Sequence, residues 1–264
     1  MTDNEGKKAG FDDLVALMAR LRGPDGCPWD REQTPTSLKP YILEEAYEVL
    51  SAIEKEDWTE LCSELGDLLL QVVFQARLAE EKGLFAVDDV TEAIVSKMTR
   101  RHPHVFGDRT VRDAGAVMEN WEKIKRAESP GRSATEGVDP RLPALLRAHR
   151  LQEKVGRVGF DWETLEGAVR KLEEELEEFR RAAADEPEER IEEEMGDLFF
   201  ALVNVARLSG INSEEALRKA IAKFENRFRK VEEGLRLRGI SPDEATLAEM
   251  EDLWQQAKRG KPAS

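Results

Sequence analysis

Carboxylates occur in closely spaced pairs along two stretches of the sequence. Glu45 and Glu48 are three residues apart, and so are Glu64 and Asp67. Residues three apart share a face of a helix, so two such helices packed side by side would bring four carboxylates together. Like charges at this spacing repel one another, and a divalent cation turns that repulsion into ligation. All-oxygen sites of this kind suit Mg²⁺, with Mn²⁺ as the alternative ion.

The same acids recur 130 residues further along the chain, where 171–208 matches 41–78. A helix rich in Glu is often only a solvated face, but such a face would exchange Glu for Lys or Gln between two copies. Repetition of the same acids at the same spacing therefore favours a metal site in each copy. The second set of candidate metal ligands is Glu175, Glu178, Glu194 and Asp197.

Cations and tryptophans also recur in both copies. An aromatic ring can stack on a base, and a nearby cation can meet phosphate. The alternative is that the cations form ordinary surface ion pairs and that each Trp buries its ring against neighbouring helices. The sequence contains neither GxxxxGK[ST] nor GxGxxG, so any phosphate would be held by metal and side chains. The repeated candidates are Lys97, Arg101 and Trp121 in the first copy and Lys223, Arg227, Trp254 and Lys258 in the second.

Composition excludes several classes of protein. The 264 residues include 55 acids and 40 bases, and this net charge of −15 argues against direct nucleic-acid binding. No apolar run approaches the ~18–20 residues that span a membrane. The N-terminal residues lack the apolar core of a signal peptide, and Cys27 and Cys62 have no metal-ligand spacing, so we expect a cytoplasmic protein. His102, His104 and His149 lie outside the acidic motifs, which disfavours a di-iron bundle.

The elements that position these residues are predicted to be helices. Apolar residues recur at intervals of three and four, as in an amphipathic helix, and none alternate with period two, so the predicted fold is all-α. Asp57 and Ser213 are predicted N-caps. Helices are expected to start near residues 11, 35, 57, 87 and 110, and again near 142, 163, 187, 212 and 243. The apolar stripe expected to pack each acidic helix against its neighbour is, in the first copy, Leu43, Tyr47, Leu50 and Ile53.

The repeat also predicts the domain organisation. A stretch rich in Pro, Gly and Ser at 128–143 shows no apolar period and is expected to be a linker. The expected domains are therefore 1–127 and 144–264, each an α-helical copy of one unit.

The ordered set of motifs resembles the MazG family of nucleoside triphosphate pyrophosphohydrolases. The family pattern is EExxE followed by ExxD, which occurs at 44–48 and 64–67 and again at 174–178 and 194–197. The segments GCPWDREQT and RLQEKVGRVGFDW are similar to those that precede the two motifs. KFENR and LWQQAKR complete the resemblance, which covers nearly the whole chain apart from the tails and the linker.

This resemblance implies tandem units that form four-helix bundles across a homodimer. It also implies Mg²⁺-dependent cleavage of nucleoside or deoxynucleoside triphosphates between the α and β phosphates, which gives a monophosphate and pyrophosphate. In the duplicated members of the family, the second copy can carry most of the activity. The implied metal ligands are Glu175, Glu178, Glu194 and Asp197, matched in the first copy by Glu45, Glu48, Glu64 and Asp67. The implied nucleotide contacts are Lys171, Lys223, Arg227, Trp254 and Lys258.

Two other functions remain open at the level of the sequence. One is a narrower hydrolase on the same scaffold, acting on dUTP or phosphoribosyl-ATP. The other is a helical protein that binds Mg²⁺ and nucleotide without turnover. For the hydrolase, a carboxylate not used by metal, Glu174 or Glu193, is the candidate to accept the proton of the attacking water.

Overall fold

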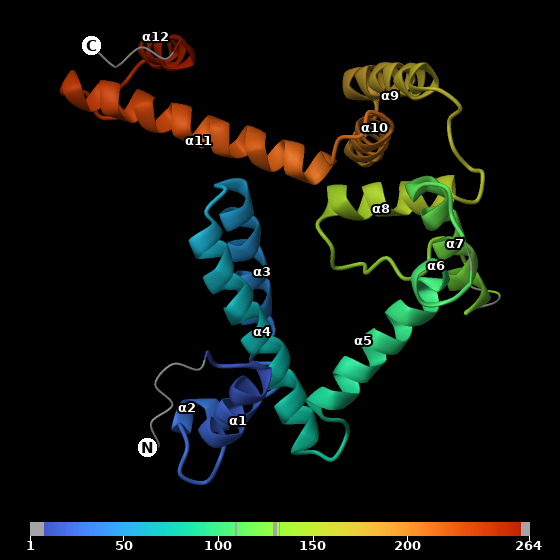
Figure 1. Cartoon of the computed structure of the whole chain (residues 1–264). Helices are drawn as coiled ribbons and strands as arrows, with labels where there is room; N and C mark the ends of the chain where they lie inside the picture. The colour runs from blue at the N-terminus through green and yellow to red at the C-terminus, as the bar shows by residue number, and fades with distance from the viewer. Residues whose placement is uncertain (1–7, 109, 129–130, 132, 260–264) are drawn as a thin grey trace. The chain divides into compact units, whose positions relative to one another are not determined.

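The computed structural model describes residues 8–108, 110–128, 131 and 133–259 (Figure 1). The chain divides into two compact units, Met1–Pro130 and Gly131–Ser264. The described residues form helices and no strand, so the prediction of an all-α fold is confirmed. Among them, no helix has the length and apolar character needed to cross a membrane.

The first unit is built on the paired helices α3 and α4, and α1 packs along α4. Two short helices, α2 and α6, were not expected; each begins at a proline, whose fixed φ suits the first helical position, and each is too short for an apolar period to reveal it. The helices are α1 (Phe11–Leu21), α2 (Pro28–Glu32), α3 (Lys39–Glu54), α4 (Trp58–Glu80), α5 (Val87–Arg101), α6 (Pro103–Phe106) and α7 (Ala114–Ala127).

The second unit repeats this plan. Helices α9 and α10 form the main pair, α8 packs on α10 as α1 packs on α4, and α12 packs on α11 (Figure 1). Its helices are α8 (Ala144–Gly156), α9 (Leu165–Asp185), α10 (Glu188–Leu208), α11 (Ser213–Leu237) and α12 (Leu247–Lys258).

Side-chain caps fix where the long helices begin. The Asp57 carboxylate accepts hydrogen bonds from the backbone N–H groups of Thr59 and Glu60, both at 3.0 Å, so this predicted cap is confirmed. Ser213 was the wrong cap for α11. The cap is Asn212, whose Oδ1 accepts from the N–H of Glu215 at 3.1 Å, because the residue just before the first turn is the one that reaches the N3 amide.

The acidic helices do not pack through the stripes that their apolar period suggests. Leu43 is 62 % exposed, and the rest of its stripe is also exposed. The buried face of α9 instead carries Ala168, Glu175 and Ala182, which are seven residues apart and so lie above one another after two turns. Small side chains let α9 and α10 approach closely, and the carboxylate of Glu175 is drawn into the seam between them.

Candidate functional site

The seam between α9 and α10 gathers three carboxylates of the second copy. Glu175 from α9 and Glu194 and Asp197 from α10 each place one oxygen within 4.8 Å of the other two. We call these three residues the C-terminal acidic cluster. Glu175 and Glu194 are buried, each 7 % exposed, whereas Asp197 is exposed.

Two cations lie against this cluster. Lys171 Nζ is 2.9 Å from Glu175 Oε1, and Arg190 forms an ion pair with Glu194. Both cations lie four residues before the acid they contact, so the helix itself brings each pair together. The pKa of Lys171 is raised by its hydrogen bonds to Glu174 and Glu175, which hold the ammonium group charged beside the cluster.

The remaining acids predicted for this site lie at its margin. Glu178 is not among the three carboxylates of the cluster and pairs with Arg181 at 3.4 Å. The exposed carboxylates of Glu174 and Glu193 pair with the same two cations that contact the cluster: Glu174 lies 2.7 Å from Lys171, and Glu193 contacts Arg190.

The first copy has a matching set, which we call the N-terminal acidic cluster: Glu45 on α3 and Glu64 and Asp67 on α4. Burial raises the pKa of Glu45, and the charges of Asp67 and Glu48 raise it further. Burial also raises the pKa of Glu64, followed by the charge of Glu48, so all four predicted acids of this copy interact.

The donor set of both clusters fits a hard divalent cation. Every candidate ligand atom is a carboxylate oxygen, which is the chemistry that Mg²⁺ and Mn²⁺ prefer. The raised pKa values of Glu45 and Glu64 reflect carboxylates that are costly to hold ionised, first because they are partly buried and then because they lie side by side; a bound dication would relieve that cost.

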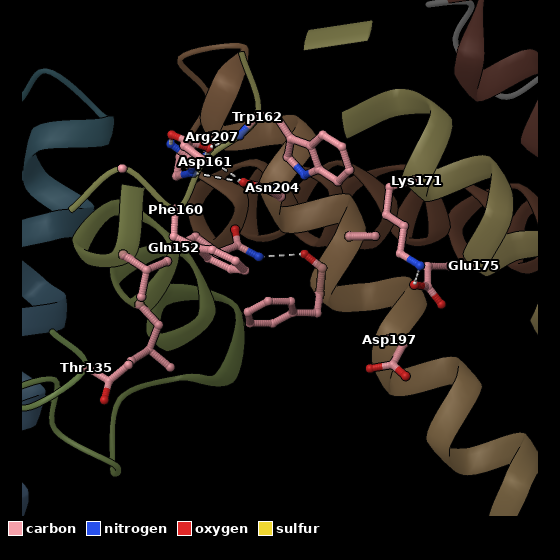
Figure 2. A pocket seen from close by; sticks show the side chains of 15 residues that line it. Thr135, Gln152, Phe160, Asp161, Trp162, Lys171, Glu175, Asp197, Asn204 and Arg207 are labelled. Carbon is pink, nitrogen blue, oxygen red and sulfur yellow. Dashed lines mark hydrogen bonds and ion pairs between the residues drawn. The ribbon is translucent and has the colours of Figure 1, made fainter. Parts of the chain in front are cut away.

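A cavity of about 650 Å³ opens beside the C-terminal acidic cluster (Figure 2). It shares Lys171, Glu175 and Asp197 with that region. The rest of its lining comes from α8, α10, the segment between α8 and α9, and Thr135, which precedes α8. Leu151, Val155, Phe160, Trp162 and Phe200 make most of this lining apolar, and the side chains of Gln152, Asn204, Asp161 and Arg207 add polar groups.

Glycines shape the segment that supplies the aromatic wall of the cavity. Gly159 has φ +91°, a left-handed conformation that favours glycine. A Cβ on Gly156 would lie 2.7 Å from Asp161 Oδ2, and a Cβ on Gly167 would lie 3.0 Å from Trp162 Cε3. The absence of these side chains lets Asp161 and Trp162 pack closely against the helices that flank them.

Apart from Lys171, Glu175 and Asp197, the residues that line this cavity were not predicted from the sequence. The segment 150–162 was noted for its family resemblance, but no role was assigned to Gln152, Phe160 or Trp162. Asn204 and Arg207 lie on α10, beyond the acidic motif. The glycines around 156–167 were the available signal, since they indicate close packing but not which side chains line a cavity.

The predicted nucleotide contacts on α11 and α12 form a separate group. Arg227 Cζ lies 6.0 Å and Lys258 Nζ 5.8 Å from the ring centroid of Trp254. Phe224 also packs on this ring, and Lys223 is exposed on the same helix. Lys171 is the predicted contact that lines the cavity, whereas Lys223, Arg227, Trp254 and Lys258 do not.

In the first copy, the matching arginine beside Trp121 forms an ion pair with a carboxylate. Arg101 Cζ lies 5.4 Å from the Trp121 ring, while its guanidinium and that of Arg100 both pair with Glu128. Hydrogen bonds from Arg101 and then Arg100 lower the pKa of Glu128 to about 2. Lys97 is exposed one turn before Arg101.

Comparison with known proteins identifies both copies. Residues 33–106 and 163–232 each match the MazG nucleotide pyrophosphohydrolase domain. The chain belongs to the MazG family. The two matched MazG segments contain the N-terminal and C-terminal acidic clusters, whereas the cavity residues Gln152, Phe160 and Trp162 precede the second segment.

Similarity to individual MazG relatives extends over nearly the whole chain. The chain is 48 % identical over 257 residues to the nucleoside triphosphate pyrophosphohydrolase of Escherichia coli K12, covering 94 % of this chain and 97 % of that protein. It is 44 % identical over 258 residues to the nucleoside triphosphate pyrophosphohydrolase/pyrophosphatase MazG of Thermotoga maritima, covering 96 % and 98 %.

Proposed function

We propose that this protein is a Mg²⁺-dependent nucleoside triphosphate pyrophosphohydrolase that converts a triphosphate and water into a monophosphate and pyrophosphate. The observation that carries the proposal is the continuity of the cavity with the C-terminal acidic cluster through Glu175, Asp197 and Lys171. An apolar cavity suits a nucleoside, and an adjoining carboxylate cluster suits a metal that binds phosphates. The names of the relatives in Escherichia coli and Thermotoga maritima agree with this reaction.

Each part of the site has a proposed task. Glu175, Glu194 and Asp197 hold Mg²⁺, with Glu178 as a further ligand from the next turn of α9. When bound there, Mg²⁺ would neutralise phosphate oxygens and lower the pKa of an attacking water. Lys171, which is held charged at the rim, stabilises the pyrophosphate leaving group. The exposed carboxylates of Glu174 and Glu193 remain the proposed proton acceptors.

We further propose that the protein acts as a cytoplasmic homodimer built from the two domains 1–127 and 144–264, joined by 128–143. The exposed apolar stripe of α3 supports assembly, because a helix face of this kind is normally buried. Lys223, Arg227, Trp254 and Lys258 lie outside the cavity lining, and we propose that they contact the triphosphate in the assembled enzyme.

Hydrolysis is assigned mainly to the second copy. Arg22 and Phe74 of the first copy occupy the repeat positions of Gln152 and Asn204. Phe74 is 3 % exposed in a hydrophobic core, and Arg22 Cζ lies 5.5 Å from its ring, so a packed core stands where the second copy has cavity residues. Glu45, Glu48, Glu64 and Asp67 would hold Mg²⁺ there, and Lys97, Arg101 and Trp121 remain proposed nucleotide contacts.

The test is to incubate the protein with each triphosphate and Mg²⁺ and to separate the products by chromatography. Equal amounts of monophosphate and pyrophosphate are expected from the common nucleotides. Turnover of dUTP or phosphoribosyl-ATP alone would establish the narrower enzyme. Formation of diphosphate and inorganic phosphate would show that cleavage occurs between the β and γ phosphates. Tight binding without any product would show that the protein binds nucleotides without hydrolysing them.

A further inference from the structure

One polar group in the cavity has an unmet hydrogen-bonding capacity. The side chain of Gln152 is buried, at 4 % exposed, on the last turns of α8. Its Nε2 donates to the backbone carbonyl of Phe200 at 2.8 Å, shown by a dashed line in Figure 2. This bond fixes which way the amide faces. The Oε1 atom is then left without a hydrogen-bond partner among the described residues.

Such an atom calls for an explanation, because buried polar atoms in folded proteins are nearly always paired. Leaving an acceptor unpaired costs free energy, and a ligand that donates to it recovers that cost. Gln152 lines the cavity, so its acceptor is available to a molecule bound there.

The side-chain amide of Asn204, which also lines the cavity, is bonded through its oxygen and not through its nitrogen. Asn204 Oδ1 accepts from Arg207 Nε at 3.0 Å and from Nη2 at 2.7 Å. Arg207 is itself held by Asp161, with Nη1 3.0 Å from Oδ2. These bonds involve the Asn204 oxygen and not its Nδ2 group. Gln152 therefore presents an acceptor to the cavity, and Asn204 presents a donor.

We propose that Gln152 is a specificity-determining residue whose Oε1 accepts a hydrogen bond from an N–H group on the edge of the nucleobase. This inference rests on the proposed function, since it places the base of a triphosphate in the cavity. Each of the common bases carries an amino or ring N–H group, so the site accepts all of them. It discriminates against a base that has none, because the Gln152 oxygen then stays buried and unpaired.

The test compares ATP with purine riboside triphosphate, which has the same rings but no N–H on the base. For the wild-type enzyme, kcat/KM for ATP should exceed that for the analogue by at least roughly tenfold, which lies within the range expected when one buried acceptor is left unpaired. In Gln152→Met the value for ATP should fall to near that for the analogue, while the analogue changes little. The wild-type comparison stands even if the variant folds poorly.

A matched control is Gln33→Met. Gln33 Nε2 also donates to a backbone carbonyl, that of Trp29 at 3.0 Å, but this residue lies in the other unit and outside the cavity. This variant should keep the wild-type preference. Equal kcat/KM for ATP and the analogue, or a full preference in Gln152→Met, would overturn the inference. Absence of the corresponding monophosphate and pyrophosphate with every common triphosphate would instead overturn the proposed function.

Discussion

At the scale of single residues, the two acidic clusters differ in their neighbouring charge. Lys171 and Arg190 contact the C-terminal cluster. The matching positions of the first copy hold Tyr41 and Glu60, so the helices supply no cation there. The N-terminal cluster therefore depends more strongly on a bound dication to offset the repulsion among its carboxylates.

This difference predicts how Mg²⁺ affects stability. Millimolar MgCl₂ should raise the melting temperature of the wild-type protein, because an ion that binds only the folded state stabilises it. Glu64→Gln should melt higher than wild type without Mg²⁺, since one repelling charge is gone, and should lose part of the Mg²⁺-dependent rise. Glu80→Gln, which removes an acid of the same helix that is paired with Arg77 away from the cluster, is the control. An unchanged Mg²⁺ response in Glu64→Gln would argue against a metal at this cluster.

The ion pairs of Glu128 predict how the stability of the protein depends on pH. Its folded pKa of about 2 lies below the ordinary value of 4.5, so its stabilising effect is present above pH 4.5 and is lost as the pH falls toward 2. The difference in melting temperature between wild type and Glu128→Gln should shrink steadily over that range. A difference that stays constant down to pH 2 would show that the ion pairs with Arg100 and Arg101 contribute nothing.

Residue types and spacing, repeated in both copies, were sufficient to point to the three acids that lie together in each copy, although Glu48 and Glu178 are not among those three carboxylates. They were not sufficient to find the cavity. Gln152 and Asn204 are ordinary polar residues in the sequence, and their importance comes from burial and from which of their atoms is already bonded. Those are properties of the packed chain.

At the scale of elements, the existence of the long helices was predictable but the face each one buries was not. The apolar period pointed to Leu43, Tyr47, Leu50 and Ile53, which are exposed in the single chain. The contact with α4 falls on the face of Ala52, just as α9 buries Ala168 and Ala182. Small side chains carry little hydrophobic signal, although they decide how closely two helices approach.

A substitution in the first turn of α9 tests whether the wall of the cavity contacts the nucleoside. Gly167→Ala should place a methyl group against the ring of Trp162 and displace it from the cavity wall. We expect kcat/KM for ATP to fall roughly tenfold, mainly through KM, because the lost contact is with bound nucleoside and not with the reacting phosphate. Gly66→Ala is the control, since a Cβ there meets nothing within 4 Å. An unchanged KM in Gly167→Ala would show that Trp162 does not contact the bound nucleotide.

At the scale of the whole molecule, one unit has been used twice with different results. Both copies keep the acids, but only the second combines its cluster with the described cavity, while Arg22 and Phe74 of the first are packed. The repeat was evident from sequence because identical motifs recur at one offset. The difference between the two copies was not evident from the sequence, because a cavity and a packed core can contain apolar and polar residues in similar proportion.

The exposed stripe of α3 predicts the assembly. Light scattering should give about twice the chain mass of 29.9 kDa at micromolar concentration. Leu43→Glu should weaken the dimer, because it places a charge in a face proposed to be buried. Leu247→Glu changes a side chain that is 80 % exposed on α12 and should leave the mass unchanged. A wild-type protein that stays monomeric would contradict the proposed homodimer.

The most direct test of the account is to measure monophosphate and pyrophosphate release by Glu175→Gln and Glu45→Gln side by side under Mg²⁺, with helical content checked by circular dichroism. The account predicts that Glu175→Gln loses on the order of 100-fold or more in kcat, because it removes a metal ligand beside the cavity. Glu45→Gln should stay close to wild type. Near-normal turnover by Glu175→Gln together with loss in Glu45→Gln would contradict the account and move the chemistry to the first copy.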